Sequence, residues 1–393
     1  MNSGFSRDTH SILRDLVRFD TTSFKSNLDL IDYVASLLTS YNIHPEIIYD
    51  PKEEKANLLA FTGPKDKPAI VLSGHTDVVP VDGQNWTVNP FDLTFKEGKI
   101  FGRGTCDMKG FIASALAALP SFINHSLTNP ICFALSYDEE VGCTGVRSLL
   151  DFLTLKSIPV QACIIGEPSS MKPVTAHTGK QVFRCDFHGT PLHSSLSPGG
   201  VNAITYAGDI IHRINELEKK IRAQTTDDDR FAYAHPTLNI GTISGGKAVN
   251  IVAEHCRFDV ECRYPPGTDH RPFTDALPQL IETQAHLPMA QQNGAASATC
   301  ERIVSYPSFE ADPTSAAVQL ARKLTGANDD LAVNYGTEAG LFQKAGFSSV
   351  VCGPGDIAQA HQPDEYISLK QLGRCDLFMQ ALADELTCRE RVE

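Results

Sequence analysis

The chain opens with two segments in which apolar positions recur at helical spacing. The first segment carries its apolar side chains at Ile12, Leu13, Leu16 and Val17. The second runs from 31 to 38 with the same periodicity. Apolar residues spaced three and four positions apart are typical of an amphipathic helix. The pattern therefore predicts two such helices near the start of the chain.

Three short apolar runs rich in β-branched residues follow, at 68–73, 131–136 and 161–166. Runs of this length that end in polar residues are typical of buried strands. Helical stretches at 111–119 and 146–152 separate them. The order strand, helix, strand, helix, strand predicts an α/β fold with a central sheet flanked by helices.

Each predicted strand ends in acidic or histidine side chains. The first is followed by Gly74-His75-Thr76-Asp77, the second by Tyr137-Asp138-Glu139-Glu140 and the third by Glu167-Pro168. In open α/β sheets, ligands bind outside the carboxyl ends of the strands. We therefore expect these three strand ends to contribute to one site.

The pattern changes near residue 180, where alternating strand-like segments appear at 181–189 and 256–264 around a long polar helix at 204–222. This combination of strand-like segments and a helix predicts a smaller α+β domain inserted into the larger one. The stretch 286–300 is polar and is predicted to be a loop that leads back to the larger domain. Helix and strand patterns resume at 316–324, 347–355 and 372–386. We expect a catalytic domain formed by 1–179 and 291–393, with the inserted domain at 180–290.

Length and charge narrow the possible partners. A chain of 393 residues is long enough for two domains, and its 47 acidic against 34 basic residues give a net charge of −13. An acidic chain without a Lys/Arg run is a poor match to nucleic acid or to an anionic membrane. The charged N-terminal segment does not resemble a secretory signal, and the 11 scattered cysteines favour reduced thiols. We expect a cytoplasmic protein.

Each candidate ligand has an ordinary structural explanation when it is taken alone. His75 and Asp77 could form a hydrogen-bonded loop, and Asp107 could cap a helix. The acidic run 138–140 could be a solvated turn, Glu167 a surface residue and His361 a structural histidine. Their combination is different, because imidazole and carboxylate groups at successive strand ends match the ligand chemistry of a divalent-metal hydrolase.

An ordered series of motifs resembles the M20 metallopeptidase-like amidohydrolases over nearly the whole chain. The motifs are SGHTDVVPVDGQNWTVNPF (73–91), GRGTCDMKG (102–110), SYDEEVGCTG (136–145), GEPS (166–169), GTPLHSSLSPGGVNA (189–203), GGKAVNIV (245–252), RYPPGT (263–268), YGTEAGLF (335–342) and GPGDIAQAHQPDEYI (353–367). The resemblance implies a metal-dependent catalytic domain with a central mixed sheet flanked by helices, and an inserted ferredoxin-like domain that serves in dimerisation or as a lid. It also implies a homodimer.

The resemblance further implies two divalent metal ions, zinc or cobalt. His75, Asp107 and Glu167 would hold one ion, and Asp107, Glu140 and His361 the other, with Asp107 bridging. Two ions at about 3.5–4 Å can polarise a carbonyl and activate water.

The same resemblance assigns roles around the metals. Asp77 would orient His75 and raise its basicity, and Glu139 would be the general base. His193 would stabilise the oxyanion, often from the partner subunit, and the less favoured alternative is a structural histidine at a strand end.

Substrate contacts are expected from Arg263 and Asn250, which match family positions for the substrate α-carboxylate, although either could serve structure alone. Thr337 and Glu338 are further candidates, and we assign Glu338 to a side-chain ammonium. The endings TEAG and AHQPDEYI resemble the branch that acts on N2-acetyl-L-ornithine, so we expect release of ornithine and acetate from this N-acyl amino acid, a step of arginine biosynthesis. Other family activities, on succinyl-diaminopimelate, other N-acyl amino acids or short peptides, stay open. So does an inactive metal-binding protein on the same scaffold.

Overall fold

The structure is a computed structural model that describes residues 8–223 and 228–387. The chain divides into two compact units. Unit 1 comprises the chain up to Thr175, together with Glu310–Leu331 and the chain from Thr337 onward. Unit 2 comprises Ala176–Phe309 and Ala332–Gly336.

Unit 1 combines a large sheet with helices, as the strand and helix patterns predicted. Its helices are α1 (Thr9–Arg18), α2 (Leu28–Ser40), α3 (Lys109–Ala117), α4 (Leu119–Asn124), α5 (Val146–Leu155), α10 (Ala316–Thr325), α11 (Ala339–Lys344), α12 (Leu369–Glu385) and the 3₁₀ turn η3 (Ile357–Gln359). Its strands, including three that reach the boundary with unit 2, are β1 (Glu46–Tyr49), β2 (Ala56–Thr62), β3 (Ala69–His75), β4 (Thr94–Lys96), β5 (Lys99–Phe101), β6 (Ile131–Ser136), β7 (Val160–Pro168), β8 (Val174–His177), β13 (Phe309–Glu310), β14 (Leu331–Val333), β15 (Ser349–Gly353) and β16 (Tyr366–Ser368).

The large sheet is mixed. Its strand order is β1-β2-β6-β3-β7-β15-β8-β13, with β14 paired to β8. Strand β3 runs parallel to β6 and to β7, and β15 runs parallel to β7, whereas β2 is antiparallel to β6. Every residue of β3 and of β6 is buried, which explains why these strands read as continuous apolar runs. The predicted α/β fold with a mixed central sheet is confirmed.

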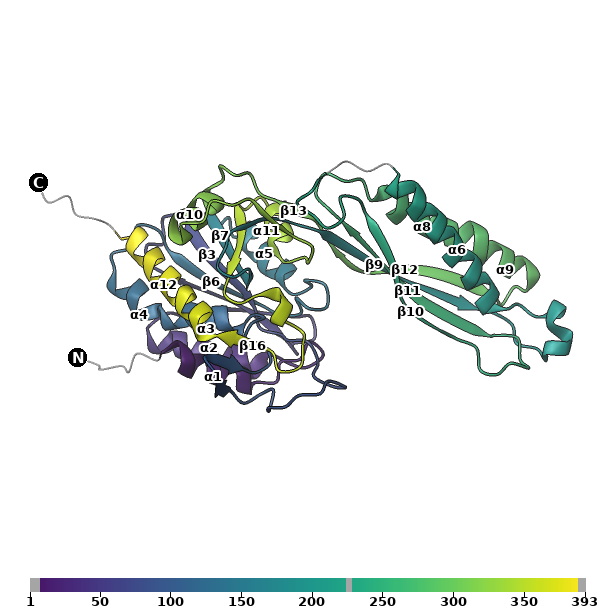
Figure 1. Ribbon diagram of the computed structural model, residues 1–393, viewed down its shortest axis with the longest axis horizontal. Helices are drawn as coiled ribbons and strands as arrows, with labels where there is room; N and C mark the ends of the chain where they lie inside the picture. Colours follow the sequence, from purple (N-terminus) through teal and green to yellow (C-terminus); the bar gives the residue numbers. More distant parts are fainter. Residues whose placement is uncertain (1–7, 224–227, 388–393) are drawn as a thin grey trace, which may run out of the picture. The chain divides into compact units, whose positions relative to one another are not determined.

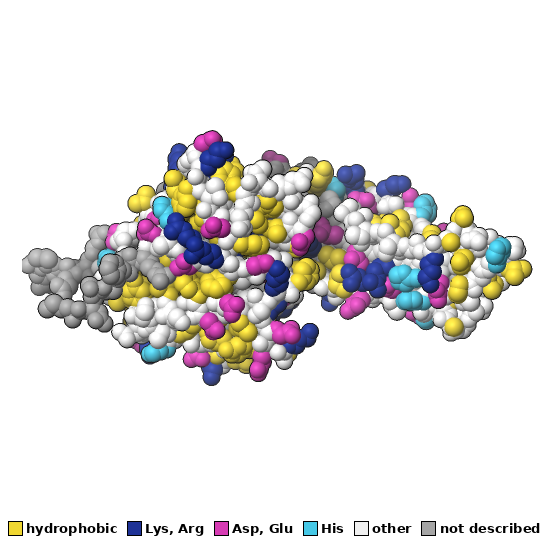
Figure 2. All heavy atoms as spheres, turned by 90° about the horizontal axis from the view of Figure 1, so that it is seen from below, with side chains coloured by type: hydrophobic (Ala, Val, Ile, Leu, Met, Phe, Trp, Pro, Cys, Tyr) yellow, Lys and Arg dark blue, Asp and Glu magenta, His cyan; other side chains and the backbone are white. Residues whose placement is uncertain are grey.

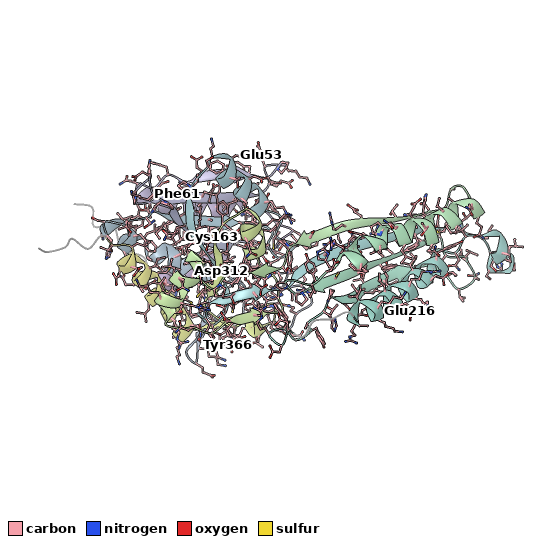
Figure 3. The ribbon with its side chains drawn as sticks, turned by 90° about the horizontal axis from the view of Figure 1, so that it is seen from above. Glu53, Phe61, Cys163, Glu216, Asp312 and Tyr366 are labelled. Carbon is pink, nitrogen blue, oxygen red and sulfur yellow. The ribbon has the colours of Figure 1, made fainter. Side chains whose placement is uncertain are left out.

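Helices α1 and α12 both pack against α3, which in turn contacts β3 and β7 (Figure 1). The first helix begins where the Asp8 carboxylate accepts a hydrogen bond from the Ser11 amide, a common N-terminal cap. The four apolar residues that predicted this helix are all buried: Ile12, Leu13, Leu16 and Val17. Cys163, labelled in Figure 3, lies on the buried part of β7. No helix within 8–223 and 228–387 combines the length and apolar character needed to cross a bilayer.

Unit 2 is a four-stranded antiparallel sheet with helices on one face (Figure 1). Its elements are β9 (Gly179–His188), the 3₁₀ segment η1 (Ser194–Gly199), α6 (Ala203–Arg222), β10 (Thr237–Gly245), β11 (His255–Tyr264), α7 (Arg271–Thr274), α8 (Ala276–Ile281), the π-helical turn η2 (Glu282–His286), α9 (Leu287–Gln292) and β12 (Ser297–Tyr306). The strand order is β10-β11-β9-β12. This βαββαβ succession is the ferredoxin-like arrangement that the resemblance implied.

Two details of the predicted organisation are wrong. The stretch 286–300 is not a loop, because it forms α9 and the start of β12. The predicted return to the larger domain at residue 291 therefore comes too early. Strand β12 pairs with β9 along its length and completes the sheet of unit 2. This part of unit 2 therefore extends to Phe309.

The two faces of the unit 2 sheet differ in character. Side chains along β9 alternate between buried and partly exposed positions, and those of β11 do the same. The buried set, which includes Phe183, Phe187 and Phe258, forms a core with α6. The other set is polar and charged apart from Val182, so the sheet keeps one face exposed.

Candidate metal centre

Three neighbouring strands of unit 1 deliver ligand-type side chains to one edge of the sheet. His75 is the last residue of β3, Glu139 and Glu140 follow the end of β6, and Glu167 lies near the end of β7. Because these strands are parallel neighbours, their carboxyl ends lie side by side. One donor atom from each of His75, Glu139 and Glu167 lies within 4.8 Å of the others. The structure thus brings the predicted strand ends together.

Asp107 stands between two histidines. Its Oδ1 lies 3.0 Å from Nε2 of His75, and its Oδ2 lies 3.3 Å from Nε2 of His361. Each carboxylate oxygen therefore faces a different imidazole. This geometry suits a carboxylate that bridges two cations.

Two glutamates complete the two halves of the cluster. Oε2 of Glu140 lies 3.0 Å from Nε2 of His361, on the Oδ2 side of Asp107. Oε1 of Glu167 lies 3.7 Å from Nε2 of His75, on the Oδ1 side. The five candidate ligands thus lie in one cluster, in which Glu140 contacts His361 and Glu167 contacts His75.

The cluster concentrates negative charge in a buried place. Burial and the nearby charge of Asp107 raise the pKa of Glu140 to about 7 and raise the pKa of Glu167 well above its usual value. Burial acts against the charged form of His75, but the carboxylates of Glu167 and Asp107 outweigh it and raise the pKa of His75. Either a proton or a cation bound among these carboxylates relieves their repulsion.

The donor set fits divalent metal ions. It consists of imidazole nitrogens and carboxylate oxygens without any thiolate, and such N/O sites accept zinc, cobalt and other divalent ions. The side chain of His361 is 49% exposed, whereas that of His75 is 1% exposed. The cluster is therefore open to solvent on the His361 side.

Asp77 holds both His75 and the loop after β6. Nδ1 of His75 lies 2.9 Å from the backbone carbonyl oxygen of Asp77 and 3.5 Å from its carboxylate. The carboxylate also accepts hydrogen bonds from the backbone amides of Glu139 at 3.0 Å and Glu140 at 3.3 Å, and from the Ser23 hydroxyl at 2.8 Å. Asp77 thus orients His75 directly. It also holds Glu139 and Glu140 in place through their backbone amides.

Glu139 lies beside the cluster and is partly buried. Its Oε1 accepts a contact from Sγ of Cys143 at 3.4 Å. Burial raises the pKa of Glu139 well above its usual value, and the charges of Glu140 and Glu338 act in the same direction. A carboxyl group with a raised pKa can take up a proton and release it again near neutral pH.

A buried network that the sequence did not reveal ties the Asp107 loop to the His361 segment. Oε1 of Glu365 accepts hydrogen bonds from the backbone amides of Cys106 at 2.9 Å and Asp107 at 3.1 Å. Its Oε2 forms a 2.7 Å ion pair with Arg103, and both side chains are 1% exposed. Gln84, which also bonds to Arg103, donates to the backbone carbonyl of His361 at 2.8 Å. Only the run of motifs around these residues could have drawn attention to them.

Glu338 occupies a different place from the one expected. The residue is 1% exposed, and its carboxylate accepts hydrogen bonds from the hydroxyls of Ser136 at 2.6 Å and Ser73 at 3.3 Å. This placement speaks against the predicted contact with a substrate ammonium, because the group is enclosed and already bonded. The neighbouring Thr337 is also fully buried, and its hydroxyl accepts a hydrogen bond from the Ala339 amide.

The remaining predicted residues lie in unit 2. His193 is exposed, and its Nδ1 lies 2.8 Å from the Ser195 hydroxyl. The backbone carbonyl of Asn250 accepts from the Ser194 amide at 2.9 Å, which ties Asn250 to the same turn as His193. Arg263 forms an ion pair with Glu261 at 2.6 Å. The structure therefore brings His193 and Asn250 together, while Arg263 lies on β11.

Comparisons with known proteins agree with this architecture. The family model described as "Peptidase family M20/M25/M40" matches residues 71–385. A curated protein of Myxococcus xanthus named acetylornithine deacetylase is 35% identical over 385 residues, which cover 93% of this chain and 94% of that protein.

Solved structures share the fold. An M20 family metallo-carboxypeptidase from Sulfolobus solfataricus superposes with a TM-score of 0.74 at 17% identity, over 96% of this chain and 98% of that one. A Bacillus subtilis protein described as a dinuclear metal binding peptidase from the M20 family superposes with a TM-score of 0.61 at 17% identity, over 98% and 99% of the two chains.

Proposed function

The chain belongs to the peptidase family M20/M25/M40, and from that premise we propose that it is a dinuclear-metal amidohydrolase that converts N2-acetyl-L-ornithine to L-ornithine and acetate. The observation that carries the metal-dependent part is the position of Asp107, whose two oxygens face His75 and His361 separately. The substrate rests on the 35% identity to a protein named acetylornithine deacetylase.

The proposed ligands of one ion are His75, Asp107 and Glu167, and those of the other are Asp107, Glu140 and His361. Two divalent ions bound there would polarise the scissile carbonyl group and make a water molecule acidic near neutral pH. The donor set suits zinc or cobalt equally, because ions of this class share N/O ligands and their availability decides which is bound.

Glu139 is the proposed general base. It takes a proton from the attacking water and passes it to the nitrogen of the leaving amine as the amide bond breaks. The raised pKa of Glu139 supports this assignment, because a carboxyl group must hold the proton between the two steps. Asp77 supports the step by holding the Glu139 backbone amide.

A variant of Glu139 separates this proposal from an inactive metal-binding protein. We expect Glu139→Ala to keep its metal ions and to lose turnover by a factor of about 10²–10⁴. The readouts are metal content per chain and the rate of ornithine release. Unchanged turnover would remove Glu139 from the mechanism, and a wild-type protein with bound metal but no activity on any amide would favour the inactive scaffold.

A substrate panel tests the choice of acetylornithine. We expect the highest kcat/KM for N2-acetyl-L-ornithine among succinyl-diaminopimelate, other N-acyl amino acids and dipeptides. If another compound gave a higher kcat/KM, the metal-dependent mechanism would stand and that compound would replace acetylornithine as the proposed substrate.

We also propose a homodimer in which His193 stabilises the oxyanion from the partner subunit. The support is the surface of unit 2. The edge strand β10 is mostly exposed, and large apolar side chains near it and near the His193 turn are exposed as well: Leu196, Ile204, Ile243, Val249 and Ile251. Such a surface is suited to a protein partner.

Mixing two inactive variants tests the homodimer and the shared site together. Glu139→Ala and His193→Ala each lack one group, so a mixed dimer contains one complete site if His193 acts across the interface. We expect activity to return on mixing. Two differently tagged inactive variants that co-purify as mixed dimers and stay inactive would contradict the proposal.

A further inference from the structure

Two histidines lie opposite each other on the exposed face of the unit 2 sheet. His188 ends β9 and His255 begins β11, and the two residues are direct partners in the antiparallel register. Their ring centroids lie 5.2 Å apart. Strand β9 is paired on both sides, with β11 and with β12, so hydrogen bonds between strands hold the backbone at His188 in place. Figure 2 shows histidine side chains among basic and acidic ones on the surface of unit 2.

A carboxylate joins the pair. Asp186 lies two positions before His188 and therefore on the same face of β9. Its Oδ1 lies 3.3 Å from Nε2 of His255, and one donor atom from each of the three residues lies within 4.8 Å of the others. Two imidazoles and one carboxylate form a ligand set that suits zinc, nickel and copper.

The surrounding charges leave room for a cation. Arg257 forms a 2.6 Å ion pair with Asp186, but both this contact and the contact with His255 fall on Oδ1. A cation can therefore bind through Oδ2 while the ion pair remains. Glu254, which precedes His255 in the chain, is already paired with Lys247 at 2.9 Å.

We propose that His188, His255 and Asp186 form a mononuclear binding site for a divalent transition-metal ion of the zinc, nickel and copper class. Water would fill the remaining coordination positions, since the three residues provide three ligands. The site belongs to unit 2, and none of its residues takes part in the cluster of unit 1. It therefore stands independently of the proposed hydrolase activity.

Retention of the untagged full chain on immobilised Ni²⁺ tests the site directly, because an ion fixed to a resin can reach only exposed ligands. We expect His188→Asn and His255→Asn to elute at a lower imidazole concentration than the wild type. The matched control is His212→Asn, which removes an exposed histidine from α6, the helix on which Glu216 is labelled in Figure 3. It should elute with the wild type. Co-elution of His188→Asn with the wild type would overturn the proposal, as would an equal shift for His212→Asn.

Equilibrium dialysis against Zn²⁺ gives a second measure. We expect the double variant His188→Asn/His255→Asn to bind one ion fewer per chain than the wild type, and each single variant to bind that ion about tenfold more weakly or worse. An equal Zn²⁺ count in the wild type and the double variant would overturn the proposal. Failure of the metal centre in unit 1 would lower the count of both proteins equally and leave the difference of one ion intact.

Discussion

Glu338 shows how burial changes the meaning of a charged residue. It follows Thr337 in a motif that suggested contact with substrate, yet its carboxylate lies under the ends of two strands and accepts hydrogen bonds from Ser73 and Ser136. Burial raises its pKa to about 7. These contacts indicate that Glu338 holds the strands β3 and β6, whose ends carry candidate metal ligands.

We predict that Glu338→Gln leaves the preference for acetylornithine over N-acetylnorvaline unchanged, because the side chain is enclosed. Removal of a direct partner of the ornithine ammonium would instead cost about 1.5–3 kcal/mol, or roughly tenfold to a hundredfold in preference. The measurement is the ratio of kcat/KM values for the two substrates in variant and wild type. A selective loss of that size for acetylornithine would show instead that Glu338 contacts the substrate ammonium.

At the residue scale, the sequence predicted the clustered side chains better than the residues that hold them in place. His75, Asp107, Glu140, Glu167 and His361 stand in motifs whose order is informative, and the structure brings all five together. The supports Arg103 and Glu365 carry no pattern of their own. Their pairing joins residues 262 positions apart, and only the folded chain reveals such a contact.

The loop before α3 depends on the ion pair between Arg103 and Glu365. Glu365 accepts from the backbone amides of Cys106 and Asp107 while it neutralises Arg103. We predict that Glu365→Ala lowers the free energy of unfolding by about 3–5 kcal/mol, because it leaves a buried guanidinium without its carboxylate. We also expect metal affinity to fall about 10–100-fold. Denaturant unfolding and metal titration provide the two readouts.

The matched control removes an exposed ion pair. Glu385→Ala breaks the pair with Lys323, whose side chain is 64% exposed, and should cost no more than about 1 kcal/mol. Equal losses for Glu365→Ala and Glu385→Ala would show that the buried pair does not support the loop.

Strand β8 ends in His177, a fully buried histidine beside Phe309. Within the described residues its Nε2 has no hydrogen-bond partner, and burial lowers its pKa to about 4. The unfolded chain binds a proton at this residue below about pH 6.5, whereas the folded chain stays neutral until about pH 4. The contribution of His177 to stability is therefore lost as the pH falls from 6.5 to 4, by at most about 3 kcal/mol.

We predict that the free energy of unfolding falls less for His177→Phe than for the wild type when the pH is lowered from 7 to 4.5. This difference does not depend on how stable the variant is at pH 7. Denaturant unfolding of metal-free protein at both pH values gives the comparison. His212→Asn, which removes an exposed histidine, should follow the wild type. An identical pH dependence for His177→Phe and wild type would contradict the assignment.

The element pattern also explains the error at 286–300. The segment contains Pro288 and Gly294 and few large apolar residues, which is typical of a loop. The structure places Pro288 just after the π-helical turn η2, inside a helical run that α8, η2 and α9 form without a break. Strand β12 has mixed exposure, so the alternation that revealed β9 and β11 is weak there, and pairing with β9 determines its structure.

For the whole molecule, the division into two units was predictable and its second boundary was not. The change of pattern near residue 180 lies close to the observed boundary after Thr175. The second boundary depends on which sheet β12 joins, and that choice is made by pairing between distant segments. The proposed metal centre lies in unit 1, so removal of metal should destabilise unit 1 in particular. Ions present at about 1,000 times their dissociation constant would contribute about 4 kcal/mol each.

The most direct test of the central claim is the return of activity when divalent ions are added to chelated protein. The His188→Asn/His255→Asn variant is suitable because it lacks the proposed site on unit 2, so that its bound ions report on unit 1 alone. We predict that exhaustive chelation abolishes hydrolysis of acetylornithine, and that added Zn²⁺ or Co²⁺ restores it as bound metal rises to two ions per chain. Metal-free protein that hydrolyses acetylornithine at the untreated rate would contradict the account.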